Sequence, residues 1–149
     1  MVHDFKKYPE LSNAQMDFYY FESPHRQITE DFVARVIRVK DGDTVQVRAE
    51  FRDFDFPIRF LDTNAPEMDQ GGSQSRDWLK QEIEGEEIEV LINPRKRVGK
   101  FGRILGEIFH QGRSINKLSL NLGYAIPFVQ DNLGDIPDTE KLFKSQEIK

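Results

Sequence analysis

Hydrophobic and polar residues alternate through the middle of the chain, which predicts a series of β-strands. Residues 33–39 are rich in β-branched side chains, and Asp41-Gly42 ends this run with a hairpin-turn signal. After the turn, hydrophobic residues face one side and polar residues the other: Val45, Val47, Ala49 and Phe51 against Gln46, Arg48, Glu50 and Arg52. A third strand over residues 54–60 follows.

In that third strand, Phe54, Phe56, Ile58 and Phe60 share one face. Arg59 must therefore lie on the opposite face, because successive side chains of a strand alternate. Pro57 has no backbone N–H and predicts an unpaired or bulged stretch of this strand.

The pattern then changes to helical spacing and back. Residues 73–84 read as a helix that begins at Ser73 or Ser75 and ends at Gly85. Strands follow over residues 87–92 and 104–109. A second helix is expected after Ser114, ending at Gly123, with three residues packed inward: Ile115, Leu118 and Leu122. The order of three strands, helix, two strands and helix predicts an α+β fold, mainly β: a five-stranded barrel with two to three helices.

The two ends of the chain stand apart from this pattern. We expect residues 1–30 to form an N-terminal extension and residues 31–149 to form the barrel domain. The extension carries an aromatic cluster at residues 18–21, near a short helix begun by Ser12 or Asn13, and we expect the cluster to pack against the barrel. Docking of this cluster to a larger assembly stays an alternative. Near the other end, Asp138 or Thr139 is expected to begin a final helix through Leu142 and Phe143.

Composition narrows the function classes. A hydrophobic content of 38% with 32% charged residues is typical of a soluble globular protein. No apolar run is long enough to cross a membrane, no secretory signal is visible, and we expect a cytoplasmic monomer without an identifiable protein partner. The absence of cysteine excludes thiolate metal sites and thiol nucleophiles. The net charge of −5 disfavours a protein that coats nucleic acid through charge alone, but leaves nucleases open.

Three short motifs carry candidate chemistry. They are Asp41-Gly42-Asp43-Thr44, the segment from Arg59 to Glu67 with Ala65-Pro66 before the glutamate, and Gly99-Lys100-Phe101-Gly102-Arg103. In this order, and from about residue 33 to 127, the chain resembles the staphylococcal nuclease (thermonuclease) family. That resemblance implies an OB-fold barrel and Ca²⁺-dependent hydrolysis of DNA and RNA that leaves 3′-phosphate ends.

The resemblance also implies a role for each matching residue. Asp43, Asn64 and the Ala65 carbonyl would hold Ca²⁺, which prefers several hard oxygen ligands. Glu67 would be the general base that activates water. Arg59 and Arg103 would clamp the phosphate, since a planar guanidinium matches paired oxygens. Asp41 is expected to shape the turn.

The chain departs from the family pattern in the residues that would bind the metal ion. Asn64 stands where the family has its second metal aspartate, so a formal charge is lost and Ca²⁺ affinity should fall. We hypothesise that Asp62 partly restores that charge, because residues 62 and 64 of one strand share a face. An OB-fold nucleic-acid-binding module with weakened or lost nuclease activity is the alternative function. The scattered His3, His25 and His110 disfavour a histidine-metal nuclease, and His110 reads as a strand-end residue.

Overall fold

The computed structural model describes residues 3–99 and 102–130. The predicted final helix near residues 138–143 lies outside the described residues, as do Lys100 and Phe101 of the third motif. The helices and strands, in chain order, are α1 (Asn13–Tyr19), η1 (Tyr20–Glu22), β1 (Phe32–Asp41), β2 (Thr44–Arg48), β3 (Phe56–Phe60), β4 (Thr63–Asn64), η2 (Met68–Gln70), α2 (Gly72–Ile83), β5 (Glu87–Leu91), β6 (Ile104–His110), β7 (Arg113–Ser114), α3 (Ile115–Asn121) and β8 (Ile126–Pro127).

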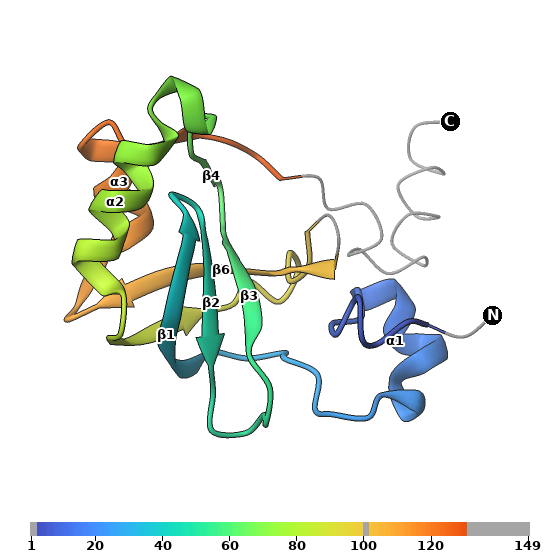
Figure 1. Ribbon diagram of the computed structural model, residues 1–149. Coiled ribbons are helices and arrows are strands. Elements are labelled where there is room, and N and C mark those ends of the chain that lie inside the picture. The colour runs from blue at the N-terminus through green and yellow to red at the C-terminus, as the bar shows by residue number, and fades with distance from the viewer. Residues whose placement is uncertain (1–2, 100–101, 131–149) are drawn as a thin grey trace, which may run out of the picture.

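Five of these strands close into a barrel. The antiparallel order β3-β2-β1-β5-β6 is completed by parallel pairing of β3 with β6, in which Ile58 lies opposite Ile104 and Phe60 opposite Gly106. The predicted α+β fold, mainly β, with a five-stranded OB-like barrel, is confirmed. Figure 1 shows α2 and α3 together on one side of this barrel and α1 on the other.

The barrel forms because the alternation found in the sequence gives each strand one apolar face. Val45, Val47 and Ala49 are buried, whereas Arg48 and Glu50 are exposed. The fully buried interior combines this face with side chains from every barrel strand and from α2: Val36, Phe56, Ile58, Phe60, Leu79, Ile83, Ile88, Val90, Ile104 and Ile108. Burying aliphatic and aromatic side chains of this size contributes about 1.5–3 kcal/mol each, which makes this interior the main source of stability.

The Pro57 prediction is confirmed at one edge of β3. On the β2 side, Pro57 lies opposite Gln46 in regular register. On the other side, pairing with β6 begins only at Ile58. The missing N–H of proline is therefore placed where the ladder has not yet started.

Four details of the sequence prediction are wrong. Helix α2 has Gly71, at φ 104°, as its N-cap, and the Ser75 hydroxyl instead donates to the Tyr124 carbonyl at 2.8 Å. Leu122 is 55% exposed because α3 ends at Asn121, one residue before it. Arg52, expected on the solvent face, is buried beside Glu10. The aromatic cluster does not pack against the barrel, since Phe18, Tyr20 and Phe21 are 71%, 51% and 99% exposed.

Candidate phosphodiesterase site

The hairpin turn between β1 and β2 presents the first motif. The Asp41 carboxylate accepts a hydrogen bond of 3.0 Å from the backbone N–H of Asp43, which is the turn-shaping role expected of it. Any side chain at Gly42 would come within 1.9 Å of the Ser75 hydroxyl of α2. The turn is thus held against α2 at a distance that only glycine permits, and this fixes the position of Asp43.

The Asp43 carboxyl group is buried and held from several sides. Its Oδ1 accepts from the Thr44 hydroxyl at 3.0 Å, and its Oδ2 accepts from the Ala65 N–H at 2.7 Å. Arg59 Nη2 lies 3.4 Å from Oδ2. Burial, followed by a hydrogen bond with the Asp41 carboxyl, raises the pKa of Asp43 to about 6 despite the Ala65 N–H and Arg59, which act in the opposite direction. Two carboxyl groups therefore lie together where positive charge only partly compensates them.

Arg59 lies on β3 with its side chain on the face away from the phenylalanines, as predicted, and is 8% exposed. Its Nη1 donates to the carbonyls of Phe60, at 2.9 Å, and Thr63, at 2.7 Å, and its Nη2 donates to Asn64 Oδ1 at 3.0 Å. Burial lowers the pKa of Arg59, and the charge of Arg103 lowers it further, whereas Asp43 raises it. The two arginines of the second and third motifs therefore lie within electrostatic range of each other.

The chain breaks between β3 and β4 at Asp62, which has a left-handed φ of 59°. The strand alternation that would place residues 62 and 64 on one side does not hold across this break. The Asp62 carboxylate instead lies 3.1 Å from Lys96 Nζ. The hypothesis that Asp62 replaces the missing metal-site charge thus loses its geometric basis.

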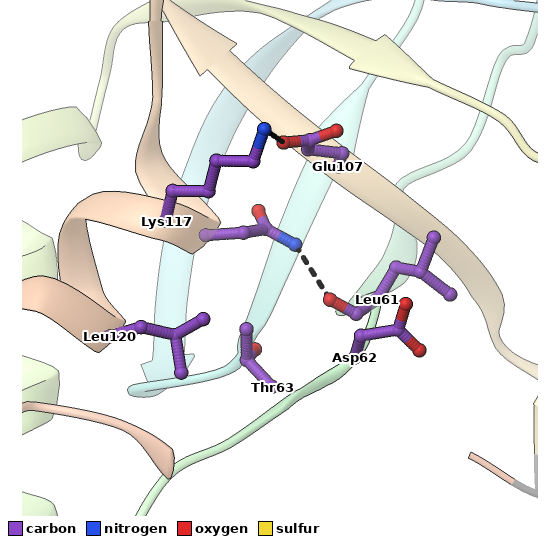
Figure 2. Close-up of a pocket in the computed structure, with 7 residues that line it drawn as sticks. Leu61, Asp62, Thr63, Glu107, Lys117 and Leu120 are labelled. Atoms are coloured by element: carbon purple, nitrogen blue, oxygen red, sulfur yellow. Dashed lines mark hydrogen bonds and ion pairs between the residues drawn. The ribbon is translucent and has the colours of Figure 1, made fainter. Parts of the chain in front are cut away.

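Asp62 borders a separate pocket of about 170 Å³ that lies between β4, β6 and α3. Figure 2 shows Leu61, Asp62 and Thr63 along one side of this pocket and Lys117 and Leu120 of α3 along the other. The buried Asn116 joins the two sides, because its Nδ2 donates to the Leu61 carbonyl at 3.0 Å. This contact fixes the segment that leads from Arg59 to Asn64.

Glu67 follows β4 at an exposed position and begins η2. Its backbone carbonyl accepts hydrogen bonds from Gln70 N, at 2.9 Å, and Gly72 N, at 2.8 Å. A side chain at Gly72 would come within 2.5 Å of the Pro66 carbonyl, so this turn is tightly packed against the start of α2. Within the described residues the Glu67 carboxylate has no hydrogen bond or ion pair, which leaves its oxygens accessible to water.

Arg103 lies just before β6. It follows Gly102, which has a φ of 66°, and its carbonyl accepts a hydrogen bond of 2.9 Å from Gly99 N. Val98 and Ile104 form a bridge beside this bond. Residues 98–99 and residues 103–104 therefore lie side by side as a hairpin-like arm. Arg103 belongs to the side of the arm that leads into β6.

The structure brings four of the six predicted site residues into direct contact: Asp43, Arg59, Asn64 and Ala65. Arg103 lies within electrostatic range of Arg59. Glu67 is two residues beyond Ala65 in the chain. Two features of the site were not predicted from the sequence. The Asp41 carboxyl group, besides shaping the turn, lies against that of Asp43. The centroid of the Phe128 ring lies 6.0 Å from the Arg59 guanidinium carbon. The spacing of Asp41 and Asp43, two residues apart, could have indicated the contact between their carboxyl groups. No feature of the sequence indicated that Phe128 would lie near Arg59.

The site contains oxygen atoms of the kind that a hard divalent cation prefers as ligands. The part of the chain that the structure describes holds no cluster of three or more His, Cys, Asp or Glu side chains that could bind a metal ion. It does offer the Asp41 and Asp43 carboxyl groups and the Asn64 amide oxygen. The raised pKa of Asp43 indicates that added positive charge would stabilise its ionised form. Calcium takes six to eight oxygen ligands, so water would supply the rest.

The sequence is similar to those of proteins named as nucleases. No protein-family model matches it. An Escherichia coli protein named as an uncharacterized endonuclease is 35% identical over 107 residues, which cover 68% of this chain and 65% of that protein. A Shigella flexneri protein named micrococcal nuclease is 34% identical over 80 residues, which cover 53% of this chain and 43% of that protein. The chain thus spans less than two thirds of the length of these relatives.

Among the described residues, no helix has both the length and the apolar character needed to cross a membrane.

Proposed function

We propose that this protein, which carries a staphylococcal-nuclease-like domain, is a Ca²⁺-dependent endonuclease that hydrolyses phosphodiester bonds of DNA, with RNA as a second substrate class. One observation carries the proposal. A buried carboxylate, Asp43 in the turn between β1 and β2, and a guanidinium, Arg59 on β3, lie 3.4 Å apart, and Asn64 and Ala65 contact the same two groups. Phosphodiester hydrolysis needs negative charge to hold a metal ion and positive charge to hold the phosphate in one site.

In this proposal Asp43, Asn64 and the Ala65 carbonyl hold the Ca²⁺, with Asp41 beside them. When bound, the ion supplies positive charge that lowers the pKa of nearby water and stabilises negative charge on the phosphate. Asp43 is held ready for this role by Thr44 and the Ala65 N–H, which fix the orientation of its carboxyl group.

Glu67 acts as the general base. Its exposed carboxylate takes a proton from the attacking water as the new oxygen–phosphorus bond forms. The bond from phosphorus to the 5′-oxygen breaks, that oxygen takes up a proton from solvent, and the products are a 3′-phosphate and a 5′-hydroxyl. Arg103 donates hydrogen bonds to the phosphate oxygens as their charge grows.

Arg59 is the second phosphate ligand in this proposal, and its existing hydrogen bonds determine which of its N–H groups can bind a phosphate. Nη1 is engaged by two backbone carbonyls and Nη2 by Asn64. A guanidinium has five N–H donors, and Asp43 Oδ2 lies 3.4 Å from Nη2, so the Nε–H is the donor left for a phosphate. The carbonyl contacts hold the guanidinium plane in place and reduce the entropy cost of orienting it.

A second candidate function is an OB-fold nucleic-acid-binding module without hydrolysis. The hydrogen bond from Arg59 to Asn64 favours it, because the residue at the second metal position is neutral and is engaged by a cation. The exposed Glu67 carboxylate argues against it, since pure binding gains nothing from a carboxylate that repels phosphate.

Incubation with supercoiled plasmid DNA distinguishes these functions. The nuclease proposal expects relaxation and linearisation with Ca²⁺ and none with a calcium chelator. A single-stranded RNA incubated in parallel tests the second substrate class. Binding that weakens with salt, without calcium-dependent cleavage of either substrate, would instead support the binding module.

A further inference from the structure

The N-terminal segment contacts the arm that carries Arg103 at three separate points. Residues 93–99 and 102–105 form this arm, which leads from β5 into β6. Near its start, Asn13 Nδ2 donates to the Pro94 carbonyl at 2.9 Å. Figure 1 shows the N-terminal segment with α1 on the side of the barrel that faces away from α2 and α3, next to this arm.

The middle of the arm is held by a buried arginine. Arg97 is 2% exposed, and its guanidinium donates to the Leu11 carbonyl and to Asn13 Oδ1, at 3.0 Å each, and to the Ile28 carbonyl from both Nε and Nη2. The Glu10 carboxylate lies 3.6 Å from it. The side chain of Arg97 thus ties the arm to the N-terminal segment.

The backbone of Arg97 reaches the opposite side of the arm. Its carbonyl accepts a hydrogen bond of 2.7 Å from Leu105 N, next to the bond between Gly99 N and the Arg103 carbonyl. These two backbone bonds connect the side of the arm that contains Arg97 to the side that contains Arg103.

The far end of the arm is held by close packing. A side chain at Gly102 would come within 2.9 Å of Tyr8 Cβ and 3.0 Å of Tyr8 Cδ1. Tyr8 therefore occupies the space over Gly102, the residue directly before Arg103. Gly102 has a φ of 66°, a left-handed backbone conformation that favours glycine. Because glycine has no side chain, Tyr8 can pack directly on this residue.

We propose that Tyr8, Asn13 and Arg97 are positioning residues for Arg103, so that the N-terminal segment is a working part of the phosphate-binding side of the site. This inference rests on the proposed nuclease function. The three contacts restrict the arm that carries Arg103, and so restrict the position of its guanidinium relative to that of Arg59. A displacement of about 1 Å at such a group can reduce the rate up to 10²-fold.

The test is a double-mutant cycle between Tyr8→Ala and Arg103→Ala, with Asn13→Ala as a second variant at the segment. Phe21→Ala is the matched control, because Phe21 belongs to the same segment and is 99% exposed. We expect Tyr8→Ala to lower kcat/KM for a single-stranded oligonucleotide by roughly tenfold, within the range that misplacement produces. In the Arg103→Ala background the same change should have an effect below about twofold, since coupled residues are not additive.

The structural role alone predicts a different result. If Tyr8 only stabilises the fold, its effect on kcat/KM will be equal in both backgrounds, or will equal that of Phe21→Ala, and either outcome overturns the inference. A second measurement, the Kd of a fluorescein-labelled oligothymidine in the presence of a calcium chelator, repeats the cycle without cleavage. A wild-type protein that neither cleaves nor binds would instead refute the proposed function, and the inference with it.

Discussion

The guanidinium of Arg59 donates a hydrogen bond of 3.0 Å to the side-chain oxygen of Asn64. This one contact joins the proposed phosphate side of the site to the proposed metal side. The amide oxygen of Asn64 accepts this hydrogen bond without adding a formal charge beside Asp43.

Replacing Asn64 by aspartate should strengthen calcium binding. A carboxylate at this position adds a formal negative charge beside Asp43, and calcium affinity rises with the charge of its ligands. We expect the Kd for Ca²⁺, measured by isothermal titration calorimetry, to fall by about tenfold, which corresponds to about 1.4 kcal/mol. Asp62→Asn is the matched control and should leave Kd unchanged, because Asp62 is paired with Lys96. An equal Kd for Asn64→Asp and the wild type would contradict the assignment of this position to the metal.

Removing the Glu10 carboxylate should destabilise the protein strongly. Glu10 lies 2.5 Å from Arg52, and both side chains are almost completely buried. The Arg52 guanidinium carbon lies 4.5 Å from the centroid of the Phe56 ring, which partly compensates its charge. Breaking a buried ion pair leaves an uncompensated charge, so Glu10→Ala should lower the free energy of unfolding by about 3–5 kcal/mol. Urea denaturation measures this, with the exposed Glu22→Ala as control; a loss equal to that of the control would show that the pair is not buried in solution.

His25 should make stability depend on pH. Burial lowers the pKa of His25, and the charge of Arg52 lowers it further, although the ring bonds to the Pro9 carbonyl at 2.8 Å. Because the folded pKa lies below the unfolded value of 6.5, the folded state binds fewer protons, and the contribution of His25 to stability is lost as pH falls through 6.5 toward the folded pKa. NMR titration of the ring should give a midpoint below 6.5, and His25→Gln should lose less stability than the wild type between pH 7.5 and 5. A midpoint at or above 6.5 would refute the burial of this ring.

The barrel was predictable because it depends on local patterns. Alternation in residues 45–51 places Val45 and Val47 inside, and Ser114 and Gly123 mark α3 through the ordinary chemistry of helix ends. His110 ends β6 as expected. These features depend only on residues that are close together in the sequence, so a local pattern is enough to predict them.

The errors arise where distant segments meet. Arg52 follows the polar face of its strand, yet Glu10, 42 residues earlier, draws it into a buried pair. Arg97 is likewise buried because Glu10 and the N-terminal segment contact it. Asp62 breaks the alternation with a left-handed backbone that no residue beside it announces. That Asp43, Arg59 and Asn64 belong to one site was expected from the family resemblance, whereas the hydrogen bond from Arg59 to Asn64 appeared only in the structure.

The central claim is that this site hydrolyses phosphodiester bonds with Glu67 as its base, and Glu67→Gln tests it most directly. The amide keeps the size of the side chain but cannot accept the proton. The measurement is the initial rate of plasmid cleavage with saturating Ca²⁺, with Asp69→Asn, an exposed acidic neighbour two residues away, as matched control. The account predicts a loss of about 10²–10⁴-fold for Glu67→Gln and an unchanged rate for Asp69→Asn. Equal rates for Glu67→Gln and the wild type would contradict it.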